Sequence, residues 1–148
     1  MTENQEQAAL FEWAGWMEHQ IPELKLLHSC PNGGYRLPKT AAVLQKTGVK
    51  SGVPDVCLPV SNGKYHALYI EMKRVKGGAV SANQRVWLNE LSKAGNRAVV
   101  CKGFEQARDT ILEYLGVKSQ DVNSCVACGA EMPEGDQVCI ICRKEHGL

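Results

Sequence analysis

The nine residues Tyr65-His-Ala-Leu-Tyr-Ile-Glu-Met-Lys73 contain the alternation of side chains on which the predicted fold depends. Successive side chains of a β-strand point to opposite faces of the sheet. One face of this predicted strand is apolar and consists of Leu68, Ile70 and Met72. The other face presents Tyr69, Glu71 and Lys73. Since the apolar face can enter a core, the glutamate and the lysine are left side by side.

A second strand is predicted just upstream, over residues 55–60, and a turn at Ser61-Asn-Gly63 joins the two strands. The apolar set of this strand is Val56, Leu58 and Val60. Asp55 opens its opposite face. Pairing of the two strands across the turn would bring Asp55 and Glu71 together near one edge of the sheet.

Helices and one more strand are predicted around this hairpin. In residues 3–19 apolar side chains recur at helical spacing, Thr2 can cap the helix, and Pro22 lies beyond its end. Ser81 and Gln84 form a capping box for a helix through residue 94. The remaining predicted elements are a helix at 39–46, a strand at 97–101 and a helix at 104–115. The order of helix, two or three strands, helix, strand and helix predicts an α/β fold with helices layered around a small mixed sheet.

Composition divides the chain into a main domain (1–116), a polar linker (117–124) and a short cysteine-rich segment (125–148). A length of 148 residues provides for one ordinary domain and a small appendage. Contents of 44% hydrophobic and 22% charged residues are typical of a soluble globular protein and exclude a disordered one. No membrane span or secretory signal is recognisable, so we expect the protein in the cytoplasm, with its thiols reduced.

Two carboxylates beside a lysine match the requirements of phosphodiester hydrolysis. Mg²⁺ and Mn²⁺ prefer hard oxygen ligands, and the bound cation lowers the pKa of a water and offsets charge that grows on the phosphate. A neighbouring ammonium group can position the water and stabilise the transition state. Taken as separate fragments, Glu71 and Lys73 can also be explained by a surface ion pair, and Asp55 after Pro54 by a turn. For the fragments alone, this plain explanation carries more weight.

The order of the motifs adds to these fragments. Gly52-Val-Pro-Asp55 is followed by Ile70-Glu-Met-Lys73 and then by Ser81-x-x-Gln84, while His28-Ser-Cys-Pro-Asn-Gly-Gly34 and Gly48-Val-Lys-Ser-Gly52 lie upstream. This order, across roughly residues 3 to 115, resembles the virus-type replication and repair nuclease (VRR-NUC) family, a branch of the PD-(D/E)xK nuclease superfamily. The resemblance implies a core like that of the restriction endonucleases.

The resemblance also implies roles for individual residues. Asp55 and Glu71 would hold a divalent metal, Mg²⁺ or Mn²⁺, and the backbone carbonyl of Met72 would be a further ligand. Lys73 would be catalytic. Gln84 would face the active site, but it is equally well explained as the closing residue of its capping box.

Family members also use a glutamate on the first helix. Here it would be Glu6 or Glu3, with Glu12 as a less favoured third choice. The alternative explanation for Glu3 and Glu6 is an acidic helix start, which the helix dipole favours. The residues themselves do not separate these possibilities.

Basic residues gather in two stretches without an acid, residues 24–54 and 72–89. Six of them are candidate DNA contacts: Arg36, Lys39, Lys46, Lys50, Arg74 and Lys76. Such charge would be needed near a phosphate backbone, although a solvated face explains the charge alone. The resemblance implies a homodimeric, structure-selective DNA endonuclease that acts on branched DNA such as four-way junctions, in the replication, repair or recombination of a bacterium or its phage. The rival hypothesis is a non-catalytic nucleic-acid-binding module with a degenerate nuclease fold, which the intact Asp55, Glu71 and Lys73 disfavour.

The cysteine-rich segment predicts a small zinc ribbon. Two C-x-x-C motifs provide four thiolates: Cys125, Cys128, Cys139 and Cys142. Zn²⁺ in structural sites takes four ligands in a tetrahedron, and a segment this short cannot fold on a core of its own without such a staple. A redox dithiol is the disfavoured alternative, and His146 in place of one cysteine is a distant second choice.

Overall fold

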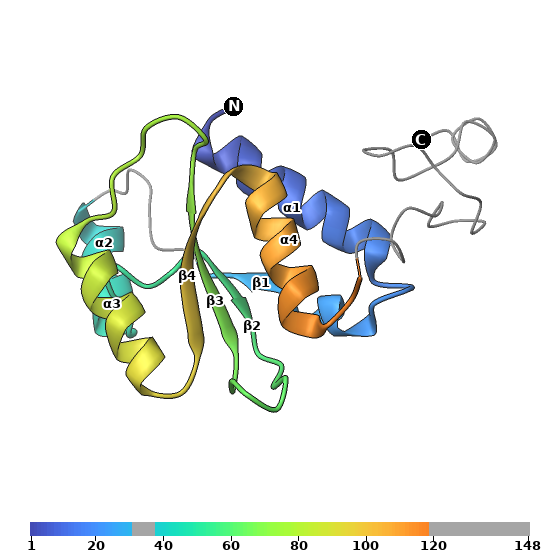
Figure 1. Cartoon of the computed structure of the whole chain (residues 1–148). Coiled ribbons are helices and arrows are strands. Elements are labelled where there is room, and N and C mark those ends of the chain that lie inside the picture. The colour runs from blue at the N-terminus through green and yellow to red at the C-terminus, as the bar shows by residue number, and fades with distance from the viewer. Residues whose placement is uncertain (31–37, 119–148) are drawn as a thin grey trace.

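The structure is a computed structural model that describes residues 1–30 and 38–118, which are organised around one mixed sheet (Figure 1). The strands are β1 (His28–Ser29), β2 (Val56–Leu58), β3 (Leu68–Lys73) and β4 (Arg97–Lys102). The helices are α1 (Glu3–Met17), α2 (Pro38–Lys46), α3 (Ala82–Lys93) and α4 (Gly103–Leu115), with a 3-10 helix, η1 (Pro22–Leu26), after α1. The strands lie in the order β1-β2-β3-β4; β3 and β4 are parallel and the other pairs antiparallel. The predicted α/β fold with a mixed sheet is confirmed.

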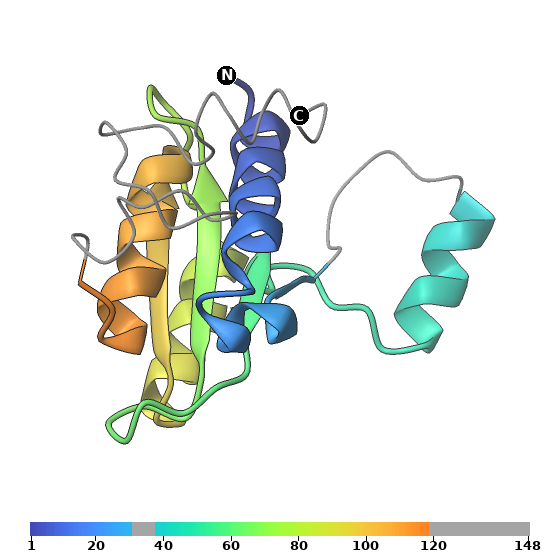
Figure 2. The same cartoon turned by 90° about the vertical axis from the view of Figure 1, so that its right-hand side faces the viewer.

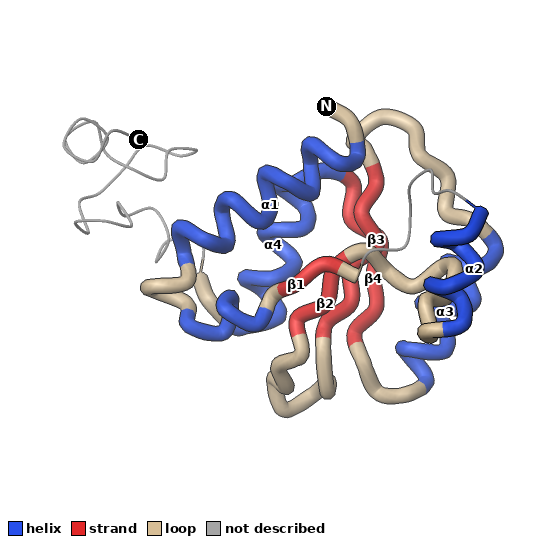
Figure 3. Tube along the Cα trace, turned by 180° about the vertical axis from the view of Figure 1, so that it is seen from behind, coloured by secondary structure: helices blue, strands red, loops and turns tan. Residues whose placement is uncertain are grey.

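The two faces of the sheet are covered unequally. Helices α1 and α4 lie together on one face, and α3 lies on the other (Figures 1 and 3). The core forms under α1 and α4, where the apolar side chains of β3 pack against both helices, whereas α3 contributes no buried residue. Figure 2 shows α2 set apart from the sheet. The sheet therefore has one deeply buried face and one face that is only partly covered.

The connection between β2 and β3 is longer than the predicted turn. Strand β2 ends at Leu58 and β3 begins at Leu68. In the loop, Asn62 Oδ1 accepts the backbone N–H groups of Lys64 (3.0 Å) and Tyr65 (2.8 Å). Backbone groups that bond to a nearby side chain are withdrawn from the ladder, so the predicted strand ends become an anchored loop.

Strand β1 was not predicted, because the sequence around residue 29 indicates a turn. Two residues are too few to show an alternation, and the strand is defined by its pairing with β2, His28 with Cys57 and Ser29 with Val56. The N–H of Cys30 continues this contact by donating to the carbonyl of Asp55 at 2.8 Å. β1 therefore extends the sheet beside the first candidate carboxylate.

Among the described residues, none of the helices combines the length and the apolar character needed to cross a membrane. Most of the predicted linker and the whole predicted zinc ribbon lie outside the described residues, as does Arg36. Lys39 belongs to α2, but the structure describes nothing of its side chain.

Candidate active site

The segment before β2 brings Asp55 to the sheet. Gly52 has φ +90°, and a Cβ there would lie 2.7 Å from the backbone carbon of Asn83, so only glycine allows this close approach to the first turn of α3. Asp55 follows three residues later, and its Oδ2 accepts the N–H of Met72 at 2.8 Å. The antiparallel pairing ends with Val56 opposite Ile70, and Asp55 and Glu71 are the next residues on the two sides of this pair. The predicted convergence of the two acids follows from this register.

Glu71 and Lys73 lie side by side on the α3 side of β3, and both are buried, with exposed fractions of 0% and 4%. Lys73 Nζ donates to Glu71 Oε1 at 2.5 Å and to the carbonyl oxygen of Met72 at 2.9 Å. The Met72 carbonyl that the resemblance implies as a metal ligand thus lies in the same group of atoms. Because a carbonyl oxygen has two lone pairs, this hydrogen bond leaves it able to accept a second partner.

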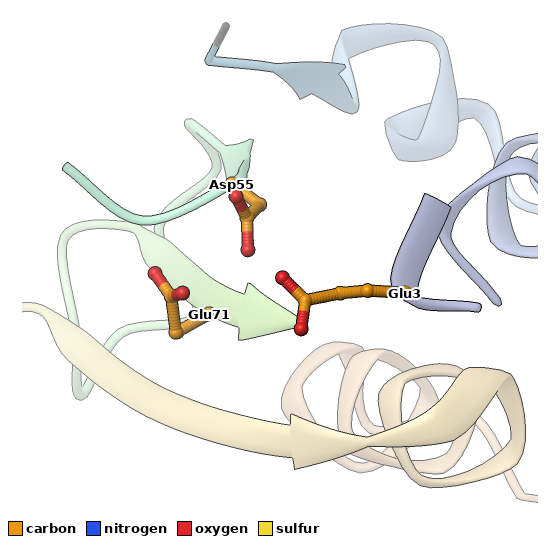
Figure 4. A group of neighbouring side chains, drawn as sticks. All are labelled: Glu3, Asp55 and Glu71. Atoms are coloured by element: carbon orange, nitrogen blue, oxygen red, sulfur yellow. The ribbon is translucent and has the colours of Figure 1, made fainter. Parts of the chain in front are cut away.

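Of the two favoured glutamates of the first helix, Glu3 is the one that meets this pair. Carboxylate oxygens of Glu3, Asp55 and Glu71 all lie within 4.8 Å of one another. Figure 4 shows the three carboxylates as neighbours, although they come from α1, from the residue before β2 and from β3. Lys73 Nζ lies 3.4 Å from Glu3 Oε1. We call Glu3, Asp55 and Glu71 the acid cluster. Glu6 points elsewhere and accepts the N–H of Phe104 at 2.8 Å.

Gln84 fills both of the roles between which the sequence left a choice. Its Oε1 accepts the N–H of Ser81 at 2.8 Å and so closes the capping box at the start of α3. Its Nε2 donates to Glu71 Oε1 in a short hydrogen bond. One side chain can do both because an amide has an acceptor at one end and a donor at the other. Gln84 therefore couples the start of α3 to the acid cluster.

The ionisable groups of the site are partly or fully removed from water, and this changes their pKa values. Burial raises the pKa of Glu71 from 4.5 to about 7, against the lowering effect of its hydrogen bond with Lys73. Burial also raises the pKa of Asp55, partly offset by the Met72 N–H. For Lys73, burial disfavours the ammonium, but its hydrogen bond and charge interaction with Glu71 outweigh burial and the pKa is raised. The site thus keeps the Lys73 ammonium charged, while the carboxyl groups of Asp55 and Glu71 hold their protons more tightly than in water.

The residues of the acid cluster fit a hard divalent cation. Glu71 Oε2 is buried and has no hydrogen-bond partner among the described residues, which is costly unless something else binds it. The donors that converge are carboxylate oxygens, the ligand type that Mg²⁺ and Mn²⁺ prefer. An unpaired buried oxygen within a ring of acids is the arrangement that a cation would satisfy.

Gly78 contributes to the site, and this contribution was not predicted from the sequence. It has φ +86°, and a Cβ there would lie 3.3 Å from Lys73 Cδ, so the loop after β3 packs closely on the lysine stem. The only signal in the sequence is the glycine pair Gly77-Gly78. Such a pair marks a tight turn or a close approach without indicating which side chain is approached.

The candidate DNA contacts that the structure describes in full are all exposed: Lys46, Lys50, Arg74 and Lys76. A groove of about 920 Å³ lies along the outer edge of β4, and none of Asp55, Glu71 and Lys73 lines it. Three exposed acids of α4 line the groove: Glu105, Asp109 and Glu113. Because acids repel a phosphate backbone, we do not take this groove, although it is large, as the nucleic-acid site.

Comparison with known proteins agrees with this geometry. No curated protein sequence matches the chain. A solved structure described as a "VRR_NUC domain protein" superposes with a TM-score of 0.67 at 28% sequence identity, and the match covers 80% of this chain and 91% of that chain. Residues 3–105 match the family model of the VRR-NUC domain. The chain therefore belongs to the VRR-NUC family and has its nuclease-type fold.

Proposed function

We propose that the protein is a DNA endonuclease that requires Mg²⁺ or Mn²⁺ and hydrolyses phosphodiester bonds. The observation that carries the proposal is the convergence of three carboxylates from separate elements within 4.8 Å of one another, beside a buried lysine. Burying charged side chains such as Glu71 and Lys73 is unfavourable for folding. Their presence in a fold of the nuclease type is explained by chemistry rather than by stability.

Glu3, Asp55 and Glu71 would hold the cation, with the Met72 carbonyl as a further ligand. The cation supplies positive charge against the phosphate and lowers the pKa of a water. The buried Lys73 keeps its ammonium charged and can offset negative charge that develops on the phosphate. Gln84 orients Glu71 through its amide N–H.

We propose DNA as the substrate. From the family resemblance, we further propose that the DNA is branched and that the protein acts as a homodimer. Four exposed basic residues would contact the phosphate backbone: Lys46, Lys50, Arg74 and Lys76. Each phosphate contact removed should weaken binding at every sequence and lower the salt dependence of binding. Light scattering on the purified protein after size-exclusion chromatography measures the oligomeric state.

The test is a cleavage assay on linear, flapped and four-way DNA, with and without Mg²⁺ or Mn²⁺. Glu71→Ala and Lys73→Ala should both lose cleavage, and circular dichroism should show that both remain folded. Lys93→Ala is the matched control, because Lys93 is exposed on α3 and pairs only with Glu90 among the described residues. Unchanged cleavage in both site variants would refute the proposed site. A wild-type protein that binds DNA without cutting it would favour the non-catalytic binding module.

We also propose a structural Zn²⁺ held by Cys125, Cys128, Cys139 and Cys142, from their spacing alone. The measurement is the metal content of the purified full chain, where we expect a single zinc per chain. Cys139→Ser should lower the zinc content, whereas Cys30→Ser, outside the C-x-x-C motifs, should leave it unchanged. Equal loss in both variants, or no zinc in the wild type, would contradict the ribbon.

A further inference from the structure

Glu6 is a buried carboxylate whose partner lies far along the chain. Its residue is 6% exposed, and Oε2 accepts the N–H of Phe104 at 2.8 Å. Phe104 is the second residue of α4, and the N-cap residue of that helix, Lys102, makes no side-chain cap hydrogen bond. The first N–H groups of a helix need partners, and a negative charge is favourable there. Glu6 on α1 thus supplies the cap that α4 lacks.

The packing around this contact is tight. Gly103 has φ +84°, and a Cβ there would lie 3.4 Å from Glu6 Oε2 and 2.6 Å from Val75 Cγ2. Val75 follows Lys73 by two residues in the loop that leaves β3. Three segments therefore come into contact: the start of α1, the loop that follows β3 and the start of α4. We call the four residues at this contact the cap junction: Glu6, Val75, Gly103 and Phe104.

The position of the Glu3 side chain is held by few contacts of its own. Glu3 is the first residue of α1, its side chain is 41% exposed, and it forms an ion pair with Lys73 Nζ at 3.4 Å. The Thr2–Gln5 capping box stabilises the same turn but does not attach it to the rest of the protein. Helix ends open easily unless tertiary contacts hold them. Glu6 lies one turn further along and provides such a contact.

We propose that Glu6 is a positioning residue of the acid cluster: by capping α4 it fixes the first turn of α1, so that the Glu3 carboxylate reaches Asp55 and Glu71. The meaning of the acid cluster as a cation site rests on the proposed function. The anchoring of α1 does not, and it can be measured in protein without added cation. This role also explains why two glutamates three residues apart are not interchangeable.

The first experiment measures Mn²⁺ binding to the full chain by calorimetry, without DNA. Glu6→Ala should weaken binding about tenfold, as loss of an outer-shell partner does. Glu6→Gln keeps an oxygen for the Phe104 N–H and should stay within about threefold of the wild type, since a neutral acceptor still caps the helix. Glu3→Gln should be at least as weak as Glu6→Ala, and Glu12→Ala, an exposed glutamate of the same helix, should match the wild type.

Two outcomes of this experiment would overturn the proposal. Binding by Glu6→Ala equal to that of the wild type would remove any role. Binding by Glu6→Gln as weak as that by Glu3→Gln would mean that the charge of Glu6 is itself used, as in a direct ligand.

The second experiment separates the anchoring from the proposed function. Amide hydrogen exchange without added Mg²⁺ or Mn²⁺ should be about tenfold faster in Glu6→Ala at Phe104 and in the first turn of α1, at Gln5 and Gln7, because both ends of the contact are released. Exchange at the buried Ile111 should be unchanged, which shows that the core is intact. Faster exchange at Phe104 with an unchanged first turn of α1 would overturn the anchoring. A wild type that binds no Mn²⁺ would contradict the proposed function, while exchange would still decide the anchoring.

Discussion

Neighbouring residues of β3 are equally buried, but their burial has opposite energetic consequences. Ile70 is 1% exposed and faces α1 and α4, whereas Glu71 is 0% exposed and faces the side of α3. Burying the apolar side chain stabilises the fold by about 25 cal/mol per Å² removed from water. Burying a carboxylate is unfavourable, and here it raises the pKa of Glu71 to about 7. One face of the strand provides stability, and the other holds reactive charge that this stability supports.

The largest separation of the two faces should come from Glu71→Gln. The variant keeps the shape of the side chain but removes a carboxylate of the acid cluster. We expect the cleavage rate to fall about 10³-fold, which corresponds to roughly 4 kcal/mol of transition-state stabilisation. At pH 8 the variant should be as stable as the wild type or more stable, because burial and the neighbouring carboxylates disfavour the Glu71 charge more than Lys73 favours it, and Lys73 keeps the charges of Glu3 and Asp55 nearby.

The measurements are the cleavage rate at saturating Mg²⁺ and the free energy of unfolding in urea. If Glu71→Gln lost stability and activity together, the α3 side of the strand would be part of the structural core. The comparison of the two faces would then fail.

The opposite substitution is Ile111→Ala, on the buried face. Ile111 is fully buried in α4, and its truncation should cost about 2–5 kcal/mol of unfolding free energy by leaving a cavity. Cleavage by the remaining folded molecules should be close to that of the wild type. Val86→Ala on α3 is the matched control: Val86 is 60% exposed, and we expect a change within about 0.5 kcal/mol. Similar costs in both variants would mean that α3 covers a second core.

The buried Glu71 on the charged face of β3 should also make the stability of the protein depend on pH. Because the pKa of Glu71 is raised from 4.5 to about 7, the folded protein holds a proton that the unfolded chain releases between these values. The free energy of unfolding therefore falls as pH rises from about 4.5 to 7, by linkage. Glu71→Gln has no such proton, so its stability relative to the wild type should grow across this window and level off above it.

Urea denaturation of both proteins from pH 4.5 to 8, without Mg²⁺ or Mn²⁺, measures this difference. A difference that stays constant with pH would mean that Glu71 has an ordinary pKa and is not held in the buried setting described above.

The sequence predicted most of what depends on local pattern. The alternation along β3 gave its two faces, and the antiparallel pairing brought Asp55 to Glu71. The choice between Glu3 and Glu6 could not be read locally, since it depends on α4, whose first N–H groups take their cap from another helix. Glu6 is separated from Phe104 by 98 positions, and no local signal spans that distance.

The remaining differences have the same origin. β1 exists only through its pairing with β2, and the close packing of Gly78 on Lys73 is visible only once the loop is folded. The sequence left a choice between a capping role and an active-site role for Gln84, because a sequence motif indicates one contact of a side chain and not two. Patterns within an element and the pairing of strands across a turn were predictable, and the other contacts between elements were not.

The smallest and most selective test concerns Gln84, which joins α3 to the charged face. Gln84→Glu keeps an oxygen for the Ser81 N–H, so the capping box and the helix content should be retained. It replaces the N–H that reaches Glu71 with a second carboxylate oxygen. Like charge at this distance raises the pKa of Glu71 further, and cleavage at pH 7 should fall about tenfold, with partial recovery as the pH rises.

Gln84→Ala is the companion variant. It loses both contacts, and so should lose about 0.5–1 kcal/mol of stability from the weakened cap as well as cleavage. Circular dichroism and the pH profile of cleavage separate the two variants. An unchanged rate and pH profile in Gln84→Glu would reduce Gln84 to a helix cap and would leave α3 without a part in the chemistry, so that the charged face would consist of the acid cluster and Lys73.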